Sequence, residues 1–172
     1  HNAGRSQMAL GFFTHHAGGH AVAWSGGSEP GTEINPTAVA AMGEVASVDL
    51  LERVGTLPAD ELRKALRRLE MAGLLVERAD AGALAYEFKH SLTQAVAYYT
   101  LLQRRRQQLH LDILKALTDA DDVAILARHA VLGEAWELAL THLRDAGHRA
   151  AAEFASVEAI AYFERALDVL NR

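Results

Sequence analysis

Hydrophobic positions beyond the first quarter of the chain follow two periods, one helical and one typical of strands. Between Leu62 and Leu69 the apolar residues stand three or four positions apart, which predicts a helix that ends at Gly73. The stretches LLVER (74–78) and LAYEF (84–88) then alternate between apolar and polar residues, as in the two strands of a hairpin. Because another short apolar helix comes first, this order predicts a winged helix.

The rest of the chain keeps a helical period. Apolar residues between 92 and 117 predict either one long helix or two helices joined near the basic run 104–106. Further helices are predicted to begin near Asp121, Glu134 and Ser156. The C-terminal part therefore has no predicted strand.

Two stretches of this helical part share a pattern of small and bulky residues. ALTHLRDA (139–146) and AIAYFERA (159–166) both read Ala, aliphatic, any residue, His or Tyr, Leu or Phe, any two residues, Ala. Small residues that let helices approach closely, between bulky ones that fill the gap, predict stacked helical hairpins of the tetratricopeptide type. Such hairpins predict a protein partner, and the candidate partner-binding residues are Trp136, His142, Tyr162 and Phe163.

The last predicted helix is expected to leave an apolar face uncovered, because helical repeats bury their surfaces only against neighbours. Its apolar residues are Ile160, Phe163, Leu167 and Leu170. We therefore expect two chains to associate through this helix, as a homodimer.

The first quarter of the chain has a different pattern, and it holds eight of the 13 glycines. SQMALGFFTHHAGG (6–19) predicts a helix with Ser6 or Asn2 near its N-cap, and HAVAWS (20–25) predicts a short strand. NPTAVAAMGEVA (35–46) predicts a second helix that has Asn35 as N-cap and Pro36 as its first residue.

Composition narrows the chemistry of this 172-residue chain. Half of the residues are hydrophobic and none is cysteine, which excludes thiolate catalysis and disulfides. The formal charge of −5 gives no electrostatic reason to expect nucleic acid as the main partner. No apolar run reaches the roughly 18 residues that span a bilayer. We expect a cytoplasmic protein with no membrane partner and no cofactor.

Histidines are the remaining candidates for metal binding or catalysis. His15, His16 and His20 have no carboxylate or thiolate at helical spacing, so we interpret them as solvent-facing and predict no metal site. His90, His110 and His129 stand beside apolar neighbours without a nucleophile in reach. The last three are predicted to be buried or capping residues, and no catalytic residue is assigned.

The blocks HNAGRSQMA, WSGGSEPG and INPTAVAAMGEV follow one another in the first 47 residues. Together they resemble the N-terminal part of arsenate reductases of the low-molecular-weight tyrosine phosphatase fold. In that family a loop Cys-x-His-Asn-x-x-Arg-Ser holds an oxyanion that the Cys attacks. His1, Asn2, Arg5 and Ser6 match the loop, and the Cys would precede His1 by two residues. The chain is therefore expected to be a fragment without reductase or phosphatase turnover.

What the resemblance leaves to this loop is weak anion binding. A helix N-terminus with an arginine nearby holds phosphate, sulfate or arsenate through its free amides. The anion-binding candidates are Asn2, Gly4, Arg5 and Ser6. The competing interpretation is a frayed terminus, because the strand that would fix the loop is missing.

A second resemblance covers residues 45–172. VDLLERVGTLPADELRKALRRLEMAGLL, YEFKHSLTQAVAYYTLLQRRRQQLH and LARHAVLGEAWELALTHLRDAG resemble the stretch after the nucleotide-binding module of large signal-transduction ATPases, including those fused to class III adenylate or guanylate cyclase domains. In that family the stretch is a winged helix followed by tetratricopeptide-like repeats. The resemblance implies a regulatory, protein-binding role, with Lys89 and His90 at the start of the helix after the wing. The sequence has no P-loop for ATP.

A winged helix raises the question of DNA binding. Arg63, Lys64, Arg67 and Arg68 crowd the helix before the wing, but Glu61, Glu70 and Glu77 stand nearby and no Asn or Gln faces outward to read bases. We interpret this surface as a solvated basic face or a domain contact.

The sequence thus predicts a mostly α protein with a small α/β N-terminal segment. Its expected domains are a phosphatase-like or arsenate-reductase-like segment (1–47), a winged helix (48–103) and tetratricopeptide-like helical hairpins (104–172). The expected function is a non-catalytic regulatory module that binds a protein. An arsenate reductase or low-molecular-weight phosphatase and a winged-helix transcription regulator are the two alternatives.

Overall fold

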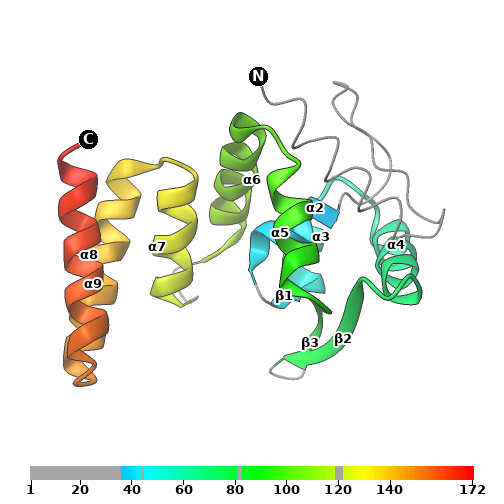
Figure 1. The fold of residues 1–172 in the computed structure, drawn as a ribbon, viewed down its shortest axis with the longest axis horizontal. Helices are drawn as coiled ribbons and strands as arrows, with labels where there is room; N and C mark the ends of the chain where they lie inside the picture. Colours follow the sequence, from blue (N-terminus) through cyan, green and yellow to red (C-terminus); the bar gives the residue numbers. More distant parts are fainter. Residues whose placement is uncertain (1–35, 44, 81–82, 119–121) are drawn as a thin grey trace. The chain divides into compact units, whose positions relative to one another are not determined.

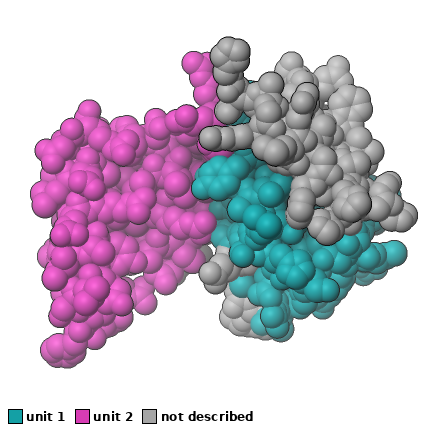
Figure 2. Space-filling model, in the orientation of Figure 1, with its two compact units in different colours: residues 1–102 teal, residues 103–172 magenta. Residues whose placement is uncertain are grey.

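The computed structural model describes residues 36–43, 45–80, 83–118 and 122–172. This part is mostly helical, with eight helices and one three-stranded antiparallel sheet, which confirms the predicted helical class (Figure 1). The helix predicted at 6–19 and the strand predicted at 20–25 lie outside the described residues. The chain divides into two compact units, residues 1–102 and 103–172, shown separately coloured in Figure 2.

In the first unit, helices pack on the strands of the sheet and on one another. Helix α4 packs on β2, α3 packs on β1 and β3, and α2 packs on α5. The elements are α2 (Pro36–Met42), β1 (Val45–Ser47), α3 (Val48–Val54), α4 (Ala59–Met71), β2 (Leu75–Asp80), β3 (Ala83–Phe88) and α5 (Ser91–Tyr99).

The predicted hairpin is confirmed. Strands β2 and β3 are antiparallel, with Leu75 opposite Phe88 and Glu77 opposite Tyr86. Ahead of it, α4 ends at Met71 and Gly73 adopts a φ of 72°, a left-handed conformation that glycine takes without steric cost. The helix stop predicted at Gly73 therefore has the expected conformational cause.

The helix predicted for residues 35–46 is too long. It ends at Met42, and Val45–Ser47 instead forms β1, which pairs with β3 so that the strand order is β1-β3-β2. Gly43 has a φ of 121°, outside the helical region. The Gln94 side chain on α5 donates hydrogen bonds to the carbonyl oxygens of Ala40 and Gly43. These hydrogen bonds satisfy two carbonyl groups at the C-terminal end of α2, shortly before β1 begins.

The core of the first unit is formed by aliphatic residues from every layer. Leu62 and Leu66 lie on the buried side of α4. At the start of α3, the Ser47 hydroxyl accepts a hydrogen bond from the amide of Leu50 at 3.1 Å and so caps the helix. The fully or nearly buried side chains include Val39, Ala41, Leu51, Leu66, Leu75 and Ala85.

The second unit is a series of helices, each packed on the next. It contains α6 (Gln103–Ala116), α7 (Val123–Leu132), α8 (Trp136–Ala152) and α9 (Ser156–Leu170). The region 92–117 is thus two helices, α5 and α6, rather than one. Helices α7, α8 and α9 begin within about two residues of their predicted starts. No described helix has both the length and the apolar character needed to cross a membrane.

The turns before α8 and α9 are conformational copies of each other. Glu134 and Phe154 have positive φ values of 57° and 61°, although neither is glycine. In each turn the next amide bonds back five residues, from Ala135 to Ala130 and from Ala155 to Ala150, both at 2.9 Å. These bonds form the Schellman closure of a helix C-terminus. The two turns stand 20 positions apart, the same offset as the repeated sequence pattern.

Helices α8 and α9 approach closely where α8 carries a glycine. A Cβ built on Gly147 would lie 2.6 Å from Cε1 and 2.8 Å from Cζ of Phe163. The Phe163 ring also meets the His148 ring edge-on, with centroids 5.4 Å apart. Gly147 therefore makes room for an aromatic ring that could not lie there beside alanine.

We predict that Gly147→Ala destabilises the protein, by about 1 kcal/mol, because an overpacking cost of about 1–3 kcal/mol exceeds the helix-propensity gain of about 1 kcal/mol. In a Phe163→Leu background the added methyl group has space, so the same substitution should cost less or stabilise. Urea unfolding of the four proteins in this double-mutant cycle measures the coupling. Equal effects of Gly147→Ala in both backgrounds would contradict this packing.

Candidate protein-binding groove

An open groove runs along the second unit, between α7 and α9. Helix α7 begins where the Asp122 carboxylate accepts a hydrogen bond from the amide of Ala124 at 3.0 Å, which fixes the first turn. Helix α9 begins after the turn at Phe154, and Leu143 of α8 lies between the two helices at the floor. The groove has a volume of about 580 Å³.

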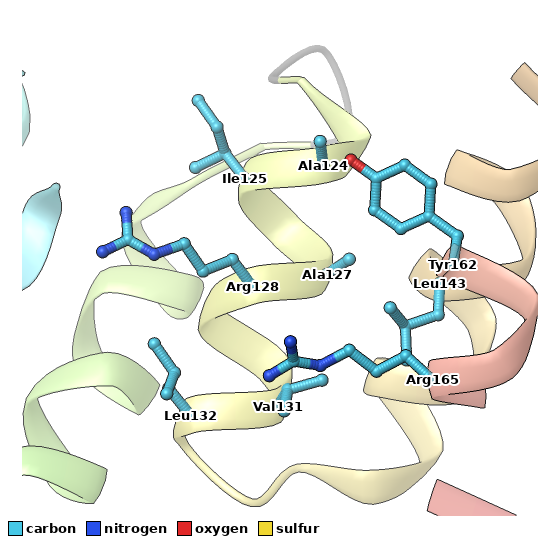
Figure 3. A pocket seen from close by; sticks show the side chains of 9 residues that line it. All are labelled: Ala124, Ile125, Ala127, Arg128, Val131, Leu132, Leu143, Tyr162 and Arg165. Carbon is cyan, nitrogen blue, oxygen red and sulfur yellow. The ribbon is translucent and has the colours of Figure 1, made fainter. Parts of the chain in front are cut away.

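The groove combines a small apolar floor with a few polar groups. From α7 it is lined by Ala124, Ala127 and Val131, whose short side chains leave space above the helix. Figure 3 shows Arg165 reaching from α9 toward α7, and the hydroxyl of Tyr162 pointing toward Ala124. The other lining residues are Ile125, Arg128, Leu132 and Leu143. Apolar surface with a few oriented polar groups is the usual composition of a binding site.

Of the four residues predicted to bind a partner, the groove lining includes Tyr162. Trp136 is half-buried against the core cluster of α7, α8 and α9, and the Arg172 guanidinium lies 5.1 Å from its ring centroid. Phe163 packs on Gly147, and His142 is half-buried on α8. Whether these three side chains touch a partner stays a prediction.

The anion-binding candidates Asn2, Gly4, Arg5 and Ser6 lie outside the described residues. The same holds for His15, His16 and His20. Within the described ranges, no cluster of three or more metal-ligating side chains is present.

Two of the four basic residues of α4, Arg63 and Lys64, form ion pairs within the first unit. The Arg63 guanidinium lies 3.2 Å from a Glu52 carboxylate oxygen, and Lys64 Nζ lies 2.9 Å from a Glu61 oxygen. These exposed pairs are worth little in stability, but they place acidic groups beside the cations. A phosphate backbone would therefore meet a partly neutralised surface.

A buried histidine pair joins α6 to α7 in the second unit, next to the groove. His110 Nδ1 and His129 Nδ1 are 2.9 Å apart, and both side chains are 0% exposed. The prediction that His110 and His129 are buried is confirmed, whereas His90 is exposed at the N-cap of α5 without a capping hydrogen bond from its side chain. Sequence spacing gave no sign that the two buried rings would meet.

One imidazole of the pair must donate and the other accept, and the lowered pKa values of His110 and His129 make both rings neutral at pH 7. Nε2 of His129 is buried and has no hydrogen-bond partner among the described residues. If His129 accepted through Nδ1, its proton would be on this orphaned Nε2. We infer the other tautomer, in which His129 Nδ1 donates to His110 Nδ1 and only an acceptor is left unpaired.

Burial is the main reason why this pair resists protonation. It lowers the pKa of His110 to about 4 and that of His129 to about 3, and the nearby positive charges of Arg128 and, for His110, Arg106 act in the same direction. Arg128 and His129 are neighbours on α7, so the helix turns a groove-lining cation outward and a neutral ring inward.

Comparisons with known proteins do not identify a family or an activity for this chain. No family model matches the chain, and no solved structure matches it. A stretch of 106 residues is 30% identical to an uncharacterized protein of Rhizobium meliloti (strain 1021), and the match covers 58% of this chain. The chain spans about 10% of the length of that relative. At this coverage the match defines neither a family nor an activity.

We predict that the protein loses stability as the pH falls below about 6.5. The folded-state pKa values of His110 and His129 lie below the ordinary value, so the unfolded chain takes up protons first and gains stability from them. Both rings contribute down to about pH 4, with a slope of at most about 2.7 kcal/mol per pH unit, and His129 alone contributes down to about pH 3. Denaturant unfolding between pH 7.5 and 4 measures this slope.

The double substitution His110→Asn/His129→Asn provides the comparison, because amides keep a hydrogen-bonding pair but do not titrate. The variant should show a flatter slope between pH 6.5 and 4, whatever its stability at pH 7.5. Parallel curves for the wild type and the double variant would show that the pair does not cause the acid sensitivity.

Proposed function

We propose that this chain is a non-catalytic regulatory module that binds a segment of a partner protein in the groove between α7 and α9. The groove itself is the observation that carries the proposal, because it joins an open apolar floor to the polar groups of Arg165 and Tyr162. Helical-hairpin proteins use such surfaces for extended protein segments. We further propose a cytoplasmic location.

The repeated turns support a tetratricopeptide-like arrangement of the second unit. The α7–α8 and α8–α9 connections share φ values and hydrogen bonds, and they share the 20-residue offset of the sequence pattern. The offset is that of one helix and its turn, which fits a series of stacked helical hairpins. Together with the hairpin and helices of the first unit, it fits a winged helix followed by helical repeats, as in the signal-transduction ATPases that the sequence resembles.

The two alternatives have weaker support. The arsenate reductase or phosphatase function, and the binding of an oxyanion, rest on residues 1–6, which lie outside the described part. A transcription regulator would need a cationic DNA-facing helix, whereas two of the four basic residues of α4, Arg63 and Lys64, already face Glu52 and Glu61. The protein-binding module therefore remains the proposal.

The groove can be tested with a random peptide library displayed on phage. We expect selected peptides that bind the wild type and lose most of their affinity for Ala124→Trp, because a large ring on the first turn of α7 would fill the groove. Calorimetry on synthetic copies of these peptides measures the loss.

Ala161→Trp is a matched control, since Ala161 is exposed on α9 and is not among the lining residues. It should leave peptide binding unchanged. If no selected peptide distinguishes Ala124→Trp from Ala161→Trp, the groove is not the binding site and the proposed function fails.

We also propose that α9 mediates homodimer formation. Four large apolar side chains on this helix are exposed, and their spacing is the same from both ends: Val157 and Ile160 (78% and 57% exposed), then Leu167 and Leu170 (58% and 62%). Two antiparallel copies of α9 would bring Ile160 of one chain opposite Leu167 of the other. A two-fold interface requires such self-complementarity.

We predict that the chain self-associates in analytical ultracentrifugation and that Ile160→Glu shifts it toward monomer, because burying a carboxylate in an apolar interface is unfavourable. The matched control is Ala161→Glu, which places the same charge on a neighbouring exposed position of α9. A wild type that stays monomeric at the highest attainable concentration, or equal effects of both substitutions, would contradict the proposed interface.

A further inference from the structure

The charges of the groove differ in sign from those of the whole chain. The chain has a formal charge of −5, yet the lining residues include two arginines and no acidic side chain. Arg128 extends from α7, and Arg165 reaches across from α9 (Figure 3). An occupant of the groove therefore meets positive charge beside an apolar floor.

Two arginines of the second unit outside the groove, Arg144 and Arg149, are paired with carboxylates. Arg144 lies 3.2 Å from an Asp145 oxygen, and Arg149 lies 3.4 Å from Asp122 and 3.2 Å from Glu153. Arg165, by contrast, makes no ion pair with any residue that the structure describes. Its guanidinium is available to a carboxylate from outside, and the Tyr162 hydroxyl on the same helix adds a donor.

The apolar floor of the groove places a second requirement on its occupant. Ala124 and Val131 leave room for larger apolar side chains from the occupant, above the nearly buried Ala127 and Leu143, which are 1% and 2% exposed. A free small anion would leave this surface exposed to water. A segment that carries carboxylates and apolar side chains together can pair with Arg165 and also cover the floor.

We propose that the groove takes an acidic segment of a partner protein, with carboxylates beside Arg128 and Arg165 and apolar side chains on the floor between them. This inference rests on the proposed function and names the class of its partner. Nucleic acid fits less well, because the lining offers Tyr162 as its one aromatic side chain for base stacking, and the chain as a whole repels phosphates.

The experiment uses a defined probe, a 16-residue blocked peptide of Leu and Glu at helical spacing, and a copy with Gln at every Glu position. Fluorescence anisotropy with the wild-type chain should show tighter binding of the Glu peptide. Each of Arg128→Gln and Arg165→Gln should weaken it about threefold, and the double variant about tenfold, as expected for exposed ion pairs. Raising the salt to 0.5 M should reduce the difference between the peptides, because salt screens such pairs.

Control variants show whether a change in affinity comes from the groove arginines, from the net charge of the chain or from misfolding. Arg144→Gln removes an exposed α8 arginine that does not line the groove, so it should leave the affinity for the Glu peptide unchanged. Arg165→Lys keeps a positive charge and should retain part of the affinity. Circular dichroism of every variant shows whether the helices are intact.

The outcomes distinguish this inference from the proposed function. Equal binding of the Glu and Gln peptides, together with loss of both in Ala124→Trp, would overturn the acidic partner and leave the groove as a protein-binding site. Library peptides that bind the groove but lack acidic residues would do the same. If neither the probes nor the library yield groove-dependent binding, the proposed function itself fails. Tighter binding of a single-stranded oligonucleotide than of the Glu peptide would replace the acidic segment with nucleic acid.

Discussion

The second unit depends on the close approach of α8 to its neighbours, and this approach depends on small side chains. Ala139, Ala146 and Gly147 of α8 are buried, and so are Ala159 and Ala166 of α9. With little volume between the helix axes, a bulky ring such as Phe163 fits only where α8 has no side chain at all. Larger residues at these positions would separate α8 from α9 and displace the floor of the groove.

The histidine pair supplies a constraint of a different kind on the same unit. Two neutral rings in a hydrogen bond at 2.9 Å fix α6 against α7 through a directional contact, whereas the alanines act by shape alone. The direction matters because His129 adjoins Arg128 in the sequence. Holding the histidine inward keeps Arg128 on the exposed side of α7, among the residues that line the groove. The same arginine opposes protonation of both rings, so groove charge and helix packing are electrostatically linked.

Local patterns were enough to predict most helices and the hairpin, because hydrophobic periodicity and the residues that start or stop a helix act over a few positions. The helix that stops at Gly73, the hairpin after it and the helices near 123, 136 and 156 all follow from such patterns. Strand β1 did not, because Val45–Ser47 is too short for a period and is fixed by pairing with β3, some 40 positions later. The histidine pair was missed for the same reason: its two members are 19 positions apart and meet only after α6 and α7 pack.

The candidate site shows how one sequence pattern serves different purposes in successive helices. His142 and Tyr162 hold the same position in the repeated pattern, as do Leu143 and Phe163. Because α8 lies between α7 and α9, Leu143 forms the floor of the groove, whereas Phe163 on α9 turns back toward Gly147. Tyr162, on the helix that forms a wall, reaches the opening, but His142 is not among the lining residues. The pattern therefore identifies residues that pack between helices, and the order of the helices decides which of them meets a partner.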